Sequence, residues 1–299
     1  MVILVTGANG FIGKKIIESL LINESNNSLI GTSIEKESFF KADKFNYICA
    51  DLSDSNFLDK FKNIDKIDVI IHCGALINYE EHLLNLIKTN CVGMYNIIEL
   101  MKNKKCKKII YISSIQVIGK IKQLPIDEKH CTDPLTLYHS TKLFGENYLK
   151  NISNIQKFIL RISSPVGNGM PNNKILKVFV KNSLEGNPLT LSGKGGRVQN
   201  YINIKDIVNA IKICIKDNTH SGIYNIASSE NISNIDLAKI CIKELNSNSQ
   251  IIFNGLEDRE ERDNWNISIK KAEEELSFKP QYFIRDTIKE IENENNVNK

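Results

Sequence analysis

The chain has 299 residues, of which 41% are hydrophobic and 25% charged, values typical of a folded globular protein and not of a disordered one. Its 39 basic and 35 acidic residues are interspersed and leave a formal net charge of +4, which argues against a nucleic-acid partner. The 7 cysteines and 5 histidines show no metal-ligand spacing, and no apolar run reaches the length of a membrane span, so we expect a cytoplasmic protein with reduced thiols, no metal and no membrane contact.

Short β-like runs alternate with longer helix-like stretches through the first half of the chain. This alternation is typical of a parallel sheet covered by helices on both faces, and it predicts an α/β, Rossmann-type doubly wound fold. The expected strands are Val2–Thr6, Ser28–Ser33, Asn46–Ala50, Val69–Cys73, Lys108–Ser113 and Lys157–Ile162. The expected helices between them are Phe11–Ile22, Ser55–Asn63, Leu83–Asn103 and Tyr138–Asn151.

The alternation becomes irregular after about Pro165, where Gly and Asn clusters mark loops. We therefore predict a dinucleotide-binding domain over residues 1–164 and a smaller C-terminal α/β substrate lobe over residues 165–299, with the chain crossing between them. Expected helices of the lobe are Ile175–Glu185, Ile204–Lys216, Asn234–Leu245, Lys270–Leu276 and a last one from Arg285.

A glycine-rich turn follows the first expected strand and opens the first expected helix. Its spacing is G-x-x-G-x-x-G, and small residues at such a turn let the backbone approach a pyrophosphate at the helix N-terminus. The position at a strand-to-helix junction favours a dinucleotide site over an ordinary tight turn. The predicted contacts are Gly7, Asn9, Gly10, Phe11, Ile12 and Gly13.

Two further positions bear on the cofactor. Asp51 and Leu52 follow the third expected strand, where the carboxylate is predicted to accept a hydrogen bond from an adenine amino group, with a turn or cap role as the alternative. At the end of the second strand, where NAD enzymes carry an acidic residue, the chain has the neutral Ser33 with Lys36 nearby, although Glu35 lies in the same loop. This composition favours NADP over NAD.

Tyr138 and Lys142 stand one helical turn apart in an expected helix and project from the same face. A lysine ammonium beside a phenol favours the tyrosinate and lowers the tyrosine pKa, so Tyr138 is a candidate general acid and base. Tyr201 and Lys205 repeat this spacing, but Tyr201 lies in a strand-like run, where residues four apart do not meet. Ser114, at the carboxyl end of the fifth strand, is the candidate partner for a substrate oxygen.

In this order, the glycine turn, Ser114 and the Tyr138/Lys142 pair resemble the extended short-chain dehydrogenase/reductase family, in particular its nucleotide-sugar epimerase, dehydratase and reductase branch. The resemblance implies that Tyr138 is the acid/base and that Lys142 holds the nicotinamide ribose. It also implies that Ser114 and Tyr138 contact the sugar and that the C-terminal lobe holds the nucleotide. Relatives commonly form homodimers through two helices corresponding to Leu83–Asn103 and Tyr138–Asn151.

Two departures from the family pattern matter. Ile115 and Gln116 replace the acidic pair with which dehydratases eliminate water, so dehydration is not expected. Gln199 replaces the arginine that binds the substrate diphosphate, which leaves Arg197, Arg259 or Arg262 as candidates, with Arg197 and Arg262 preferred.

The function expected is hydride transfer at C4 of a nucleoside-diphosphate sugar. We favour a 4-keto-sugar reductase because of the neutral Ser33 and the short chain, with a 4-epimerase holding NAD as the alternative. A non-catalytic dinucleotide-binding regulator is the rival from another class, and retention of Tyr138 and Lys142 argues against it.

Overall fold

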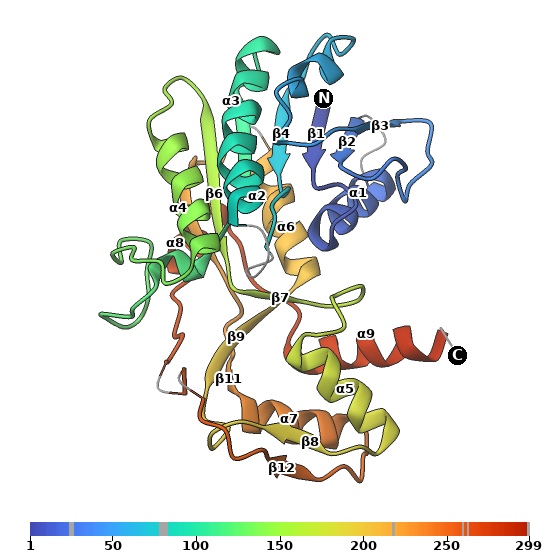
Figure 1. The fold of residues 1–299 in the computed structure, drawn as a ribbon, viewed down its shortest axis with the longest axis vertical. Coiled ribbons are helices and arrows are strands. Elements are labelled where there is room, and N and C mark those ends of the chain that lie inside the picture. Colours follow the sequence, from blue (N-terminus) through green and yellow to red (C-terminus); the bar gives the residue numbers. More distant parts are fainter. Residues whose placement is uncertain (24–26, 78–82, 217–218, 259, 262, 298–299) are drawn as a thin grey trace. The chain divides into compact units, whose positions relative to one another are not determined.

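The computed structural model describes residues 1–299 except 24–26, 78–82, 217–218, 259, 262 and 298–299 (Figure 1). The chain forms two compact units. The first contains residues 1–120, 131–161 and 210–224, and the second contains 121–130, 162–209 and 225–299. We predicted a boundary at residue 164 together with crossings of the chain that the sequence did not locate; in the structure the segments 121–130 and 210–224 lie in the other unit than that boundary alone would give. The second of these belongs to the first unit because it supplies the last strand of that unit's sheet.

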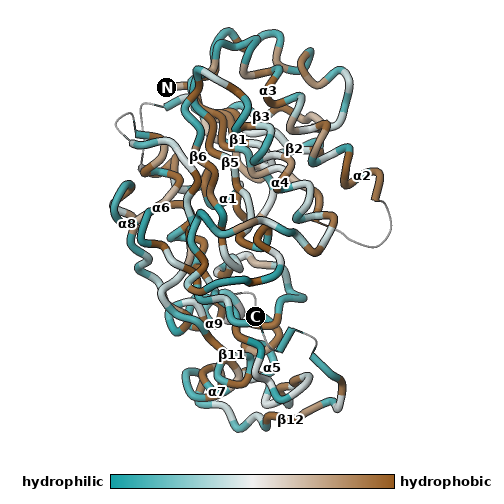
Figure 2. Tube along the Cα trace, turned by 90° about the vertical axis from the view of Figure 1, so that its left-hand side faces the viewer, coloured by the Kyte–Doolittle hydropathy of each residue, from teal (hydrophilic) through white to brown (hydrophobic). Residues whose placement is uncertain are grey.

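The first unit is built on a seven-stranded sheet in the order β10-β6-β5-β4-β1-β2-β3, and pairing is parallel from β3 across to β5. Near-continuous apolar runs form these strands because both faces of a parallel sheet are covered. In Figure 2 strands β1, β5 and β6 form the hydrophobic centre of this unit. The strands are β1 Val2–Thr6, β2 Ser28–Ser33, β3 Phe45–Cys49, β4 Val69–His72, β5 Lys108–Ser114, β6 Gln156–Ile162 and β10 Gly222–Ile226.

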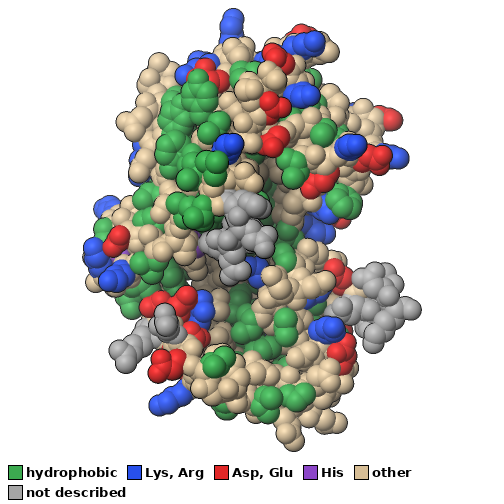
Figure 3. Space-filling model, viewed as in Figure 1, with side chains coloured by type: hydrophobic (Ala, Val, Ile, Leu, Met, Phe, Trp, Pro, Cys, Tyr) green, Lys and Arg blue, Asp and Glu red, His purple; other side chains and the backbone are tan. Residues whose placement is uncertain are grey.

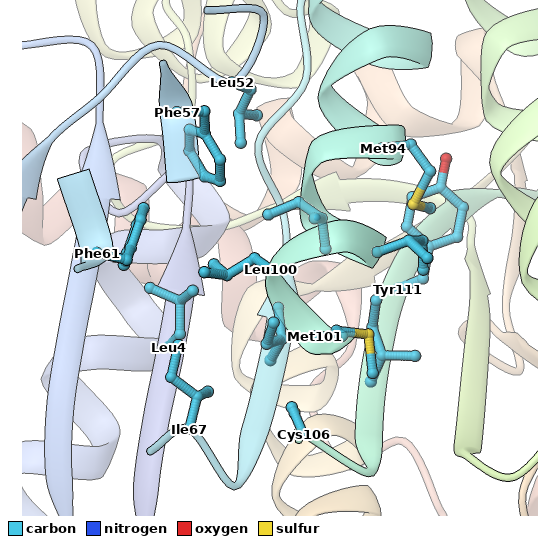
Figure 4. Packing of buried hydrophobic residues seen from close by; sticks show 14 of the residues in the cluster. Leu4, Leu52, Phe57, Phe61, Ile67, Met94, Leu100, Met101, Cys106 and Tyr111 are labelled. Atoms are coloured by element: carbon cyan, nitrogen blue, oxygen red, sulfur yellow. The ribbon is translucent and has the colours of Figure 1, made fainter. Parts of the chain in front are cut away.

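Helices pack an apolar cluster onto one face of this sheet. Figure 4 shows Phe57, Phe61 and Leu100 of this cluster, close to Leu4 of β1. Each such fully buried side chain contributes about 1.5–3 kcal/mol to stability. The helical segments of the unit are α1 Phe11–Asn23, η1 Phe57–Phe61, α2 Leu83–Ile87, η2 Lys88–Val92, α3 Gly93–Asn103, η3 Ile115–Ile118, α4 Leu137–Lys150 and the end of α6.

The helix predicted over Leu83–Asn103 is interrupted by the π-helical turn η2. Asn90 lies in this turn, buried, and its amide nitrogen donates to the Leu76 carbonyl (3.0 Å) and to Thr141 Oγ1 (2.9 Å). Its Oδ1 accepts from the Leu76 amide at 2.8 Å. The wider turn thus points the Asn90 amide at Thr141 of α4, one residue from Lys142. Single π-helical turns inside α-helices are frequent at functional sites.

The second unit contains two small sheets, with orders β11-β9-β7 and β12-β8. Among the described residues of the whole chain, no helix is long and apolar enough to cross a membrane. Elements of this unit are β7 Ser164–Val166, α5 Ile175–Glu185, β8 Leu189–Leu191, β9 Val198–Asn203, the start of α6 Ile204–Ile215, β11 Asn231–Ser233, α7 Asn234–Glu244, β12 Ile251–Phe253, α8 Lys270–Leu276 and α9 Ile284–Val297.

Candidate active site

The glycine turn joins β1 to α1 at the point where the sheet order reverses, between β1 and β4, which is where open α/β sheets bind ligands. Gly7 has φ +65°, and a Cβ there would lie 2.8 Å from the Gly74 Cα. A Cβ at Gly13 would lie 2.1 Å from the Gly7 carbonyl oxygen, so only glycine lets α1 start this close to the strand. This bare cradle at a helix N-terminus, where Phe11 and Ile12 begin α1, fits a dinucleotide pyrophosphate.

The loop after β2 is tied to this turn by Asn9. Its amide nitrogen lies 3.4 Å from Glu35 Oε2, 2.8 Å from the Glu37 carbonyl oxygen and 3.2 Å from the Tyr47 hydroxyl. Hydrogen bonding from the Ser33 side chain is the largest cause that lowers the pKa of Glu35 below its usual value. The carboxylate beside Ser33 therefore belongs to Glu35, two residues past the strand end.

Asp51 lies at the neighbouring strand end and forms a local turn. Its Oδ1 accepts from both the amide and the hydroxyl of Ser53, each at 2.8 Å. Leu52 is buried beside the glycine turn, with its Cδ1 2.7 Å from where a Cβ on Gly74 would stand. The adenine contact of Asp51 stays a prediction.

Tyr138 and Lys142 lie on α4, whose N-terminus is capped by Thr136: its Oγ1 accepts from the His139 amide at 3.3 Å. The cap starts the helix one residue before Tyr138, and the Lys142 ammonium lies 5.7 Å from the Tyr138 ring centroid. Lys142 is 3% exposed and donates to the Ile112 carbonyl oxygen at 2.9 Å. The two predicted catalytic groups are therefore neighbours.

Burial governs the ionisation of the groups around Lys142. It lowers the pKa of Lys142 to about 8, because charge is costly away from water. Burial and the Lys142 charge together lower the pKa of His72 to about 3 and that of His139 to about 4, so both imidazoles are neutral near pH 7. Burial raises the pKa of Cys73 to about 12, so this thiol is neutral too.

Ser114 ends β5 and caps the short helix η3, where its Oγ accepts from the Gln116 amide at 3.2 Å. The preceding Ser113 has a different partner, since its hydroxyl donates to Glu146 Oε1 at 2.7 Å. Glu146 is fully buried and also accepts from Arg161 Nε (2.9 Å) and Nη2 (2.7 Å). Ser113 is thereby engaged in a buried ion-pair network, which leaves Ser114 as the strand-end hydroxyl available for a substrate.

Residues 3–227 match the NAD dependent epimerase/dehydratase family. This chain belongs to that family. Among curated proteins, it is 28% identical over 301 residues to a putative UDP-glucose 4-epimerase of Methanocaldococcus jannaschii, covering 97% of both chains. It is 28% identical over 265 residues to the dTDP-D-glucose 4,6-dehydratase of Dictyostelium discoideum, covering 79% of this chain and 60% of that protein. Among solved structures, the UDP-glucose 4-epimerase of Thermotoga maritima with UDP-glucose superposes with a TM-score of 0.89 over 100% of both chains, at 20% identity.

Membership of the epimerase/dehydratase family confirms the predicted family, the Rossmann-type fold and the expectation of an NAD(P)-dependent sugar-nucleotide enzyme. The comparisons show no preference for NADP, and several of the similar structures contain NAD. Tyr201 lies in strand β9, as predicted for the competing Tyr/Lys pair.

The residue that would bind the substrate diphosphate is the least defined part of the predicted site. Arg197 lies in the second unit and forms ion pairs with Glu260 and with Asp258, the latter at 3.9 Å. The other two candidates, Arg259 and Arg262, lie outside the described residues.

The buried residues around the predicted catalytic pair were not singled out from the sequence. Tyr111 and the pair Glu146/Arg161 are buried around α4 and come from β5, β6 and the helix itself. One signal was present: Glu146 follows Lys142 by one helical turn on an otherwise buried face, and a buried glutamate requires a cationic partner.

Proposed function

We propose that this protein is a nucleoside-diphosphate-sugar 4-epimerase that retains NAD and oxidises and reduces the ring carbon C4. The observation that carries the proposal is the Lys142 ammonium beside the Tyr138 ring, in the unit that carries the dinucleotide cradle. Bound NAD supplies the hydride acceptor and donor. Tyr138 takes the proton of the C4 hydroxyl when C4 is oxidised and returns it when C4 is reduced.

The neighbouring residues have separate roles in this proton transfer. Lys142, charged below a pH of about 8, favours the ionised phenol of Tyr138 and, by family resemblance, binds the nicotinamide ribose. Ser114 holds the sugar oxygen with its hydroxyl. Ile115 and Gln116, next in the chain, offer no carboxylate to remove a proton from a neighbouring carbon, which argues against dehydration.

Two features of the sequence favoured a reductase, and observations on the structure and its relatives weaken both arguments. The first was the neutral Ser33, but the Glu35 carboxylate accepts a hydrogen bond from it. The second was the short chain, but the Thermotoga epimerase is matched over 100% of both chains. The whole-length likeness to a putative epimerase adds support for epimerisation.

The proposal is tested by incubating the purified protein with UDP-glucose, UDP-glucuronic acid and dTDP-glucose, in separate reactions. We expect NMR to detect the C4 epimer of at least one of them, with no net change in the near-ultraviolet absorbance of reduced nicotinamide. Stoichiometric consumption of NADPH with a 4-keto sugar would instead identify a reductase. Absence of binding and turnover with every sugar nucleotide would support the non-catalytic regulator.

We further infer that Glu35 selects NAD. A carboxylate at this strand end accepts a hydrogen bond from the ribose 2′-hydroxyl and repels a 2′-phosphate. We expect fluorescence titration to give tighter binding of NADH than of NADPH. A Glu35→Gln variant should raise the NADPH affinity relative to NADH by about 10-fold or more, the value of a charged hydrogen bond.

Glu37→Gln is the matched control for this titration, because Glu37 lies in the same loop and contributes only its carbonyl oxygen to Asn9. It should leave the affinity ratio unchanged. Equal binding of both nucleotides by the wild-type protein, or an unchanged ratio in Glu35→Gln, contradicts the assignment and restores NADP.

The homodimer and the diphosphate contact remain proposals. Figure 3 shows hydrophobic side chains gathered over α3 and α4, and this supports pairing of two copies through these helices. The exposed apolar side chains of these two helices include Tyr95 and Phe144, and the segments α2 and η2 that precede α3 add Leu84, Ile87 and Val92. Arg197 is the described arginine that we propose for the substrate diphosphate, which it can bind only by exchanging its carboxylate partners.

A further inference from the structure

Lys142 is buried among uncharged groups. It is faced by His72 at the end of β4 and by Cys73, the next residue, and from its own helix by Tyr138 and His139. Within the described part of the chain the Lys142 ammonium has no carboxylate partner, and the nearby Glu146 is paired with Arg161. Something other than an ion pair must therefore hold this cation beside Tyr138.

Tyr111 of β5 is a further neighbour of Lys142. The ammonium lies 5.1 Å from the Tyr111 ring centroid, closer than to the Tyr138 ring and within the range of a cation–π contact. The Tyr111 hydroxyl also donates to the Lys142 backbone carbonyl oxygen at 3.3 Å. Burial raises the pKa of Tyr111 well above its usual value, so the ring stays neutral.

The Tyr111 ring is itself fixed by its surroundings. It is 3% exposed and stacks on the His72 imidazole, with centroids 5.6 Å apart. Figure 4 shows Met94 of α3 next to it. Gly145 makes room for the hydroxyl, since a Cβ at that position would lie 2.5 Å from the Tyr111 oxygen. A ring held this firmly can set the position of a flexible lysine side chain.

We propose that Tyr111 is a positioning residue whose ring holds the Lys142 ammonium beside the phenol of Tyr138. The Ile112 carbonyl oxygen accepts one N–H of the ammonium, and the ring face attracts the rest of its charge. Without the ring, burial would disfavour the charged amine further, and Tyr138 would lose the cation that favours its ionised form. This inference deepens the proposed function and rests on it only for the effect on turnover.

The first test follows Lys142 itself, without substrate or cofactor. Protein labelled with ¹³C at the lysine ε-carbons is titrated by NMR, and the Lys142 signal is assigned by its loss in Lys142→Met. Tyr111→Phe keeps the ring and should titrate close to wild type. Tyr111→Leu should titrate about one pH unit lower, the size of a desolvated cation–π contact.

Tyr148→Leu is the matched control, since Tyr148 of α4 packs against the same apolar cluster and has no contact with Lys142 among the described interactions. It should leave the Lys142 titration in place. If Tyr111→Leu does not fold, the test uses instead a series of variants with phenylalanine at position 111 that carries one to three ring fluorines. The fluorines keep the ring's shape and weaken its attraction for a cation, so the pKa of Lys142 should fall stepwise with each added fluorine.

Turnover gives the second readout. The alkaline limb of the pH profile of kcat should move down with the Lys142 titration in Tyr111→Leu, while Tyr111→Phe keeps the wild-type profile. An unchanged Lys142 titration in both Tyr111→Leu and the fluorinated series, or an equal shift in Tyr148→Leu, overturns the inference. A shifted titration in a protein that turns over no sugar nucleotide leaves it standing and rejects the proposed function.

Discussion

Replacing Tyr138 with phenylalanine is expected to lower kcat by about 10²–10⁴-fold, the usual contribution of a positioned general acid and base. The variant lacks only the hydroxyl that we propose exchanges a proton with the sugar. Its ring can still lie 5.7 Å from the Lys142 ammonium, so the local packing should persist. Because proton transfer contributes in the transition state and not in binding, kcat should fall much further than KM rises.

Tyr148→Phe is the control for this prediction, since it removes a phenol hydroxyl from the same helix, more than two turns from Tyr138. Steady-state kinetics on the substrate identified by the sugar-nucleotide assay provide the measurement, with NADH titration to check that the cofactor site is intact. Full turnover by Tyr138→Phe would remove Tyr138 from the chemistry and would point to another proton donor.

Six of the seven strands of the Rossmann unit were predictable because each depends on neighbours close in sequence, whereas β10 was not among the expected strands. The apolar runs around Leu4, Ile70 and Ile110 are buried on both faces and indicate parallel strands without any long-range information. The glycine turn and the Tyr138/Lys142 pair are also local, since they span seven and five residues. For these features, periodicity and turn chemistry were sufficient.

The parts of the site that escaped prediction depend on residues far apart in the chain. The position of Glu35 beside the cofactor turn depends on Asn9, 26 residues away, because Asn9 ties the Glu35 loop to the glycine turn. Tyr111 meets Lys142 across 31 positions. The sequence shows the residues in each case but not the pairing, because tertiary contacts rather than spacing create it. Ser33 and Glu35 were both visible in the sequence, but the hydrogen bond between their side chains was not.

The same limit explains the choice between Ser113 and Ser114. They are adjacent and chemically equal, and resemblance to a family decided between them. The structure adds a physical reason, because successive residues of a strand point to opposite faces. Ser113 faces the buried Glu146, whereas the Ser114 hydroxyl accepts from the Gln116 amide at the edge of the sheet.

Glu146→Gln should destabilise the protein by about 3–5 kcal/mol, the cost of leaving a buried charge without its partner. Arg161 is 2% exposed and donates two hydrogen bonds to the Glu146 carboxylate. Neutralising Glu146 therefore leaves the guanidinium buried without an opposite charge. Urea denaturation followed by circular dichroism measures the loss. Glu99→Gln, which breaks the exposed pair with Lys102, should cost no more than about 1 kcal/mol.

The double variant Glu146→Met with Arg161→Met separates the charge from the packing. It removes both charges and fills the space with apolar atoms, so it should recover most of the stability lost in Glu146→Gln. Recovery would show that the penalty comes from the stranded guanidinium and not from the loss of the network that joins α4 to β5 and β6. A double variant as unstable as Glu146→Gln would contradict this, and it would mean that the hydrogen bonds themselves, including the one from Ser113, hold the catalytic helix on the sheet.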